Sequence, residues 1–287
     1  MIRYFLVSTE HFSDRILFQN EEDFKVAMNM VAVAACVSGA VVLDFILMSN
    51  HVHFIIKGTE EKVKLFVTTF KRLYGRYLAS SQRVHKVFRN NSIDIRQVWK
   101  EDESLKRAIA YVHMNSVAAN ICLNPQQYPW GCGGIFFNKR SVTGTKIGSI
   151  SIRAQHRLSH SNVSLPADYI ITSEGFIAPE SFVPVDAVEQ LFGTAKSFQF
   201  FLNQSSKAKA RLEGKASPAF RDQVIASSIQ DLCNTLFRKY SIADLSKEEK
   251  SELLKQLRFR FSSDLAQLSR VTAIPYSEAA ALLEEQF

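Results

Sequence analysis

Two histidines in a short apolar stretch are the residues of this sequence that most readily suggest chemistry. Residues 41–57 read VVLDFILMSNHVHFIIK, two runs of β-branched and aromatic residues on either side of a polar turn at 48–50. In the second run the side-chain period of two sends His51 and His53 to one face of the strand. A lone histidine in such a run is usually a hydrogen-bonded core residue. Two together each need a partner or a metal ion to offset their desolvation, so we interpret the pair as metal ligands.

A tyrosine and an asparagine on one helix face are the second candidate group. In residues 107–120, RAIAYVHMNSVAAN, Tyr111 and Asn115 lie one helical turn apart, whereas His113 projects to a different face. A divalent cation held by the two histidines and the amide oxygen of Asn115 would polarise a phosphodiester, and the Tyr111 phenolate would attack it and form a phosphotyrosine. This set predicts transesterification with Mg²⁺ or Mn²⁺ as the cofactor. The alternative for Tyr111 is a structural role, because a tyrosine on an amphipathic helix is usually a core residue and the spacing to Asn115 does not exclude this.

These stretches resemble a known family. Three motifs carry the resemblance in this order: MSNHVHFII at 48–56, YVHMNSVAAN at 111–120 and YPW at 128–130. They are similar to the MPNHVHLL, YIHLNPVRAG and YPWSS motifs of the IS200-like single-tyrosine transposases, and most similar to the branch called REP-associated tyrosine transposases. The resemblance covers about residues 2–136, and it departs from the family pattern at Ser49 and Ser116, where that pattern has proline.

The resemblance implies an activity and a partner. In that family the histidine–hydrophobic–histidine (HUH) motif binds a divalent metal, which assigns His51 and His53, and the tyrosine of the second motif is the nucleophile, which assigns Tyr111. Asn115 is carried over as a third metal ligand. The family cuts single-stranded DNA, often a hairpin, through a 5′-phosphotyrosine and leaves a free 3′-hydroxyl. We therefore expect a DNA nicking and strand-transfer enzyme, a transposase, that acts as a monomer or homodimer.

The elements around these motifs predict an α+β domain. The expected order is a strand at 2–8, a helix at 21–38 closed by Gly39, two strands within 41–57, a helix at 60–81, an irregular basic segment at 83–100 and a helix at 103–119. This order favours an antiparallel sheet with helices packed on one face, of the ferredoxin-like kind found in HUH nucleases.

Basic residues gather on two of these segments and predict contacts to DNA. The 287-residue chain has a formal net charge of +7 and a pI near 9.2, which is compatible with a polyanionic partner. The candidate DNA-binding residues are Lys64, Lys71, Arg72 and Arg76 on the helix at 60–81, and Arg83, Lys86, Arg89, Arg96 and Trp99 in the segment that follows. A solvated helix face is the alternative for the first four. The resemblance makes Tyr74 and Tyr77, on the same helix, unsuitable as the nucleophile.

Changes in composition divide the chain into three predicted parts. Residues 1–137 are the predicted catalytic domain, residues 138–165, rich in Gly, Ser and Thr, are a predicted linker, and residues 166–287 are a predicted helical domain. Within the last part, residues 262–284 have the pattern of a helix-turn-helix, with a plain helical hairpin as the alternative.

Other features limit the classes of protein that fit. We see no membrane-spanning stretch or signal peptide, and four scattered cysteines indicate reduced thiols in a cytoplasmic protein. The alternative function is a non-cleaving, regulatory DNA-binding protein that keeps the transposase fold. A metallohydrolase that cuts phosphodiesters without a covalent intermediate is a third reading.

Overall fold

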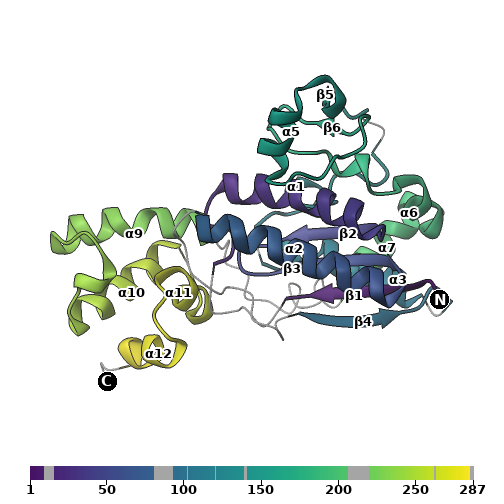
Figure 1. The fold of residues 1–287 in the computed structure, drawn as a ribbon. Helices are drawn as coiled ribbons and strands as arrows, with labels where there is room; N and C mark the ends of the chain where they lie inside the picture. Colours follow the sequence, from purple (N-terminus) through teal and green to yellow (C-terminus); the bar gives the residue numbers. More distant parts are fainter. Residues whose placement is uncertain are drawn as a thin grey trace.

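A four-stranded antiparallel sheet lies at the centre of the structure (Figure 1). The computed structural model describes residues 1–9, 16–80, 93–101, 103–119, 121–138, 141–205, 220, 222–261 and 263–284. The strands are β1 (Arg3–Ser8), β2 (Val41–Leu47), β3 (Val52–Gly58) and β4 (Asp94–Val98), in the spatial order β2-β3-β1-β4. Helix α1 (Glu21–Ser38) joins β1 to β2, and α2 (Glu60–Ser80) follows β3. The expected antiparallel sheet is therefore confirmed.

The remaining elements follow the sheet in the chain. They are α3 (Ser104–His113), α4 (Asn115–Ala118), β5 (Thr145–Lys146), α5 (Ile152–Ser159), β6 (Ile170–Ile171), α6 (Val185–Phe192), α7 (Ala195–Gln204), α9 (Asp222–Phe237), α10 (Lys247–Phe261), α11 (Leu265–Thr272) and α12 (Tyr276–Glu284). None of the helices in the described ranges is both long enough and apolar enough to cross a membrane.

The ends of α1 show how local sequence sets an element. The Asn20 side chain accepts a hydrogen bond from the backbone N–H of Asp23, which caps the first turn. At the other end Gly39 adopts a φ of 58°, a left-handed conformation that glycine takes without strain. The predicted helix at 21–38 is therefore confirmed at both ends.

Strand β4 lies in the segment that was predicted to be irregular. It pairs antiparallel with β1, with Arg96 opposite Leu6. As an edge strand it is buried only at Val98, so it lacks the apolar run that identified the other strands. The prediction of an irregular segment at 83–100 is wrong for residues 94–98. The rest of that segment, up to residue 92, lies outside the described residues.

Helices cover both faces of the sheet, whereas the sequence predicted one. Phe54 of β3 contacts Phe66 and Phe70 of α2, with ring centroids 5.1 and 5.3 Å away, so α1 and α2 cover that face (Figure 1). The preceding residue, His53, points to the opposite face and contacts Tyr111 of α3. The sheet therefore separates α2 from α3.

The described residues form two separate hydrophobic cores. The boundary between them does not lie in the predicted linker at 138–165. The first core runs from β1 to Leu202 of α7, and the second is formed by buried residues from Ile225 to Leu282. Helix α5, inside the predicted linker, packs on α1, where the Asn29 side-chain amide donates to the carbonyl of Leu158 at 3.1 Å. Residues 141–205 thus belong to the first unit, and the second unit is α9 to α12, at the opposite end of the molecule from the N-terminus (Figure 1).

The last two helices have the outline predicted for residues 262–284. Helices α11 and α12 contact each other and are joined by residues 273–275. Residue 262 lies outside the described residues. A helix-turn-helix that binds DNA stays a prediction.

Candidate active site

His51, His53 and Tyr111 form one cluster on the α3 face of the sheet. The ring of His53 is fully buried, and its centroid lies 4.9 Å from that of His51 and 5.4 Å from that of Tyr111. The His53 ring is nearly perpendicular to both, at 80° and 83°. His51 and Tyr111 are partly exposed. The fold thus brings the two predicted metal ligands beside the predicted nucleophile.

The turn before β3 orients His51. Its Nδ1 lies 2.9 Å from the side-chain oxygen of Asn50. When Nδ1 carries the proton it donates to this oxygen, and Nε2 then keeps its lone pair for a metal ion. The backbone N–H of Met48 donates to the carbonyl of His51 at 2.8 Å, which closes the turn.

Asn115 lies at a break in the predicted helix at 103–119. Helix α3 ends at His113 and α4 begins at Asn115. The amide nitrogen of Asn115 donates to the carbonyl oxygens of Tyr111 and Val112, at 2.9 and 3.3 Å. Because these bonds use the nitrogen, the amide oxygen is the atom of this side chain that could bind a cation.

The donor set fits a divalent transition metal. Among the described residues, no group of three His, Cys, Asp or Glu side chains could hold a metal ion. A cation at His51 and His53 would therefore take its further ligands from an amide oxygen, water or substrate. Imidazole nitrogens are common ligands of transition metals, whereas Mg²⁺ is bound mainly through oxygen, so the two histidines suit a transition metal better than Mg²⁺.

His113 lies away from this cluster, as its helix position predicted. Its Nε2 is 3.3 Å from Oδ1 of Asp44 on β2, and both side chains are buried. Burial raises the pKa of the Asp44 carboxyl, and the His113 side chain partly opposes this effect. Burial beside Asp44 also raises the pKa of the Cys132 thiol. These three residues link β2, α3 and the chain after Trp130 in the core.

The YPW motif supports the edge of β2. The Tyr128 hydroxyl donates to the carbonyl of Leu47 at 2.7 Å, and the Leu47 N–H donates to the carbonyl of Trp130 at 2.9 Å. A Cβ atom at the next residue, Gly131, would overlap the carbonyl oxygen of Phe45. The third motif of the resemblance is therefore structural in this chain.

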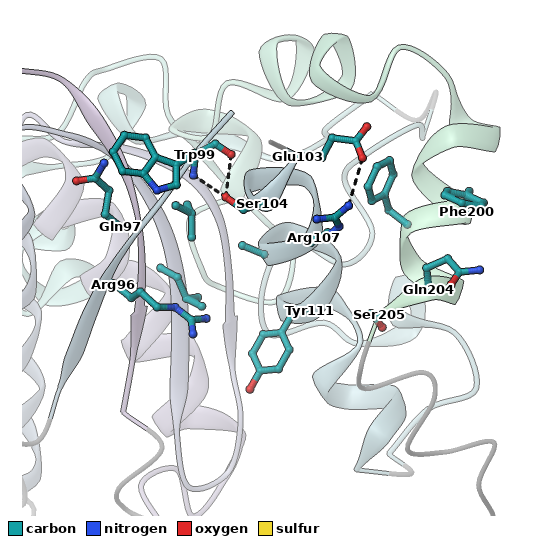
Figure 2. A pocket seen from close by; sticks show the side chains of 14 residues that line it. Arg96, Gln97, Trp99, Glu103, Ser104, Arg107, Tyr111, Phe200, Gln204 and Ser205 are labelled. Carbon is teal, nitrogen blue, oxygen red and sulfur yellow. Dashed lines mark hydrogen bonds and ion pairs between the residues drawn. The ribbon is translucent and has the colours of Figure 1, made fainter. Parts of the chain in front are cut away.

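A cavity of about 670 Å³ opens beside Tyr111 (Figure 2). Its walls come from β4, α3 and α7, and its lining includes Arg96, Trp99, Glu103, Arg107, Tyr111, Phe200, Gln204 and Ser205. Arg96 and Tyr111 extend toward the same end of the cavity (Figure 2). The side chains of Trp99 and Phe200 are 54% and 59% exposed, so both offer aromatic surface to a ligand.

Ser104 fixes the backbone at Trp99. Its Oγ accepts from the Trp99 N–H at 2.6 Å and donates to the Trp99 carbonyl at 3.0 Å (Figure 2). Arg107 lies one turn further along α3, with its guanidinium 3.6 Å from the Glu103 carboxylate. Arg107 precedes Tyr111 by four residues, so helical spacing alone could have identified it as a site residue.

The structure splits the predicted DNA-binding residues into two groups. Of those in the described ranges, Arg96 and Trp99 line the cavity. Four others are on α2, across the sheet from Tyr111: Lys64, Lys71, Arg72 and Arg76. Three lie outside the described residues: Arg83, Lys86 and Arg89. The basic residues of α2 are therefore not part of the Tyr111 cavity, and their contact with DNA stays a prediction.

Local contacts on α2 explain several of its polar groups. Lys64 forms an ion pair with Glu60 at 2.6 Å, and partial burial lowers the pKa of Lys71. The Tyr74 hydroxyl donates to the carbonyl of Leu17 at 2.7 Å, and the Tyr77 hydroxyl donates to Asp23 at 2.8 Å. Both tyrosine hydroxyls thus bond to residues on the face of the sheet that α1 covers, and these bonds give the two side chains a structural role.

Helix α7 supplies a cavity wall that the sequence did not predict. Its Phe201 packs in the first core, with the ammonium of Lys106 on α3 5.3 Å from the ring centroid. Packing of α7 on α3 places Phe200 and Gln204 at the cavity. No local signal connects residues 195–204 with α3, because the contact is long-range.

Comparison with known proteins yields one distant structural likeness. No known protein-family model matches the sequence, and no curated protein was found to be similar to it. One solved structure, described as "Structure of the REP associates tyrosine transposase bound to a REP hairpin", is similar over 46% of this chain and 75% of that chain. The TM-score is 0.32 and the sequence identity 10%. It indicates a distant structural relationship only.

Proposed function

We propose that this protein is a metal-dependent enzyme that cuts and rejoins single-stranded DNA through a covalent bond to Tyr111. The observation that carries the proposal is the ring contact of Tyr111 with His53, which itself lies against His51. A phenol is a nucleophile for phosphodiesters, and two adjacent imidazoles are metal ligands. Tyr111 also lines a cavity that contains Arg96 and Arg107, and this supports phosphoryl transfer.

The reaction can be written with this chain's residues. A divalent cation held by His51 and His53, with the Asn115 amide oxygen as a third ligand, would offset charge on the phosphate. The Tyr111 phenol oxygen forms a bond to phosphorus, and the bond from phosphorus to the 3′ oxygen breaks. The phenol loses a proton, and the leaving 3′ oxygen gains one to become a hydroxyl. Attack by a 3′-hydroxyl on the phosphotyrosine reverses these steps, and attack by a different 3′ end gives strand transfer, the reaction of a transposase.

The cavity supports single-stranded or hairpin DNA as the partner. The Arg96 guanidinium, at the same end of the cavity as Tyr111, would bind a phosphate oxygen. The exposed rings of Trp99 and Phe200 suit stacking on bases. Only bases that are unpaired or splayed out expose a face for such stacking.

The direct test is adduct formation on labelled single-stranded DNA. We expect a covalent product on denaturing gels with Mn²⁺, its loss on chelation of the metal, and its loss in Tyr111→Phe without a change in DNA affinity. Tyr77→Phe is the matched control, because its hydroxyl contacts Asp23 on the other side of the sheet. An adduct formed by Tyr111→Phe at the normal rate would exclude Tyr111 as the nucleophile.

The same assay separates the alternatives. DNA binding by the wild type with neither adduct nor cleavage, in Mg²⁺ and in Mn²⁺, would favour the non-cleaving regulatory protein. Cleavage without an adduct would favour a metallohydrolase.

A further inference from the structure

The helical unit at the C-terminal end contacts the turn that carries His51. The hydroxyl of Ser49 donates to Oδ2 of Asp222, the first residue of α9, at 2.6 Å. The two residues are 173 positions apart in the chain, and both are buried, at 8% and 4% exposure. A hydrogen bond to a carboxylate is among the stronger kinds, and burial strengthens it further.

Asp222 is itself held by α11. Arg270 donates from Nε to Oδ2 at 3.2 Å and from Nη2 to Oδ1 at 3.4 Å. The Gln267 side-chain amide donates to Oδ1 at 2.9 Å. Each carboxylate oxygen therefore accepts two hydrogen bonds, and the buried negative charge is balanced by an arginine. The position of the carboxylate is set by two helices of the second core.

The neighbour of Asp222 fixes the backbone side of the same turn. The Gln223 side chain donates to the carbonyl of Phe18 at 2.6 Å. The backbone N–H groups of Leu17 and Phe18 donate to the carbonyl of Ser49 at 2.7 and 3.0 Å. Asp222 thus holds Ser49 directly through its hydroxyl, and Gln223 holds Phe18, whose backbone N–H donates to the Ser49 carbonyl.

We infer that Asp222 is a positioning residue for the histidine pair. Its bond to Ser49 fixes the turn between β2 and β3, and the Met48–His51 backbone bond passes that constraint to His51. Ser49 is a position where the sequence departs from the MPNHVHLL pattern, and a proline there would lack the hydroxyl that Asp222 accepts. The second helical unit therefore sets the orientation of a metal ligand in the first. The catalytic consequence rests on the proposed function, whereas the structural coupling does not.

The test uses full-length Ser49→Ala and Asp222→Asn proteins. Hydrogen exchange of the backbone amides at 48–53 is measured without metal, followed by Mn²⁺ titration calorimetry and the rate of adduct formation. Loss of a hydrogen bond to a charged group predicts about tenfold faster exchange in the turn. We expect a comparable rise in the Kd for Mn²⁺ and a comparable fall in adduct rate. Single-stranded DNA affinity should stay the same, because the cavity walls come from β4, α3 and α7.

The matched control is Ser227→Ala, also on α9. The Ser227 hydroxyl donates to the Val224 carbonyl of its own helix at 2.9 Å, so its loss should leave the turn unchanged. Ser49→Ala deletes a single oxygen, which keeps the test informative if Asp222→Asn does not fold.

Three results have distinct meanings. Unchanged exchange at 48–53 in Ser49→Ala would overturn the inference. Faster exchange confined to α9–α12 in Asp222→Asn would also overturn it, because Asp222 would then stabilise only its own unit. If the wild type forms no adduct, faster exchange in the turn still supports the positioning role, and only the proposed function fails.

Discussion

Replacement of Phe198 by alanine should destabilise the first core, although Phe198 lies in the part of the chain predicted to be a separate domain. Its side chain is 4% exposed. The centroid of its ring lies 4.9 Å from that of Phe192 and 5.4 Å from those of Phe137 and His113. These contacts join α7 to the end of α3, the helix that carries Tyr111.

The expected size of the effect follows from burial. A buried phenylalanine replaced by alanine lowers the free energy of unfolding by about 3–5 kcal/mol, because apolar contacts are lost and a cavity remains. For a unit of this size that corresponds to a fall in Tm of roughly 6–20 °C. Phe200 is two residues further along α7 and 59% exposed, so the same substitution there should change the free energy of unfolding by no more than about 0.5 kcal/mol.

The assay is thermal unfolding of full-length Phe198→Ala and Phe200→Ala, with single-stranded DNA affinity measured on both at a temperature where both are folded. We expect Phe198→Ala to lower the Tm of the first unit and Phe200→Ala to leave it unchanged. Phe200→Ala should instead weaken DNA binding, because it removes an aromatic surface from the cavity. Equal shifts in Tm for the two variants would refute the assignment of α7 to the first core.

Three further perturbations test the cavity, the separation of the two sheet faces and the buried acid. Trp99→Ala should weaken single-stranded DNA binding by about 1–3 kcal/mol in fluorescence anisotropy, and an unchanged Kd would exclude stacking on this ring. Arg96→Ala should slow adduct formation, whereas Arg72→Ala, on the far side of the sheet, should not; equal rates in single-turnover gels would contradict this separation. Because burial raises the pKa of Asp44, the stabilisation from its neutral form is complete below the ordinary value of 3.8 and is lost as pH rises through the raised pKa. The Tm of the wild type should therefore fall with rising pH relative to Asp44→Asn in differential scanning calorimetry, and parallel curves would show that Asp44 does not titrate abnormally.

Features with a local cause could be predicted from the sequence. The ends of α1 follow from Asn20 and Gly39, whose effects act within one helical turn. The common direction of His51 and His53 follows from the period of two in an extended chain, and the ring contact between them confirms it. The different directions of Tyr111 and His113 likewise follow from helix geometry alone.

Edge strands and surface segments are harder to predict from the sequence than buried strands and capped helices. Strand β4 was missed because an edge strand buries little, so its residues alternate without an apolar run. Residues 138–165 were interpreted as a linker from their Gly, Ser and Thr content. Composition does not show that α5 packs on α1 through a contact such as that of Asn29 with Leu158.

The tertiary structure alone decided which distant segments complete the site. Strand pairing and side-chain alternation place α2 and α3 on opposite faces, which removes Arg72 and Arg76 from the neighbourhood of Tyr111. The same applies to α7 at the cavity and to Asp222 at Ser49, 173 residues apart. Such contacts depend on a match in shape and hydrogen bonding between segments far apart in the chain, and no residue spacing along the chain records that match.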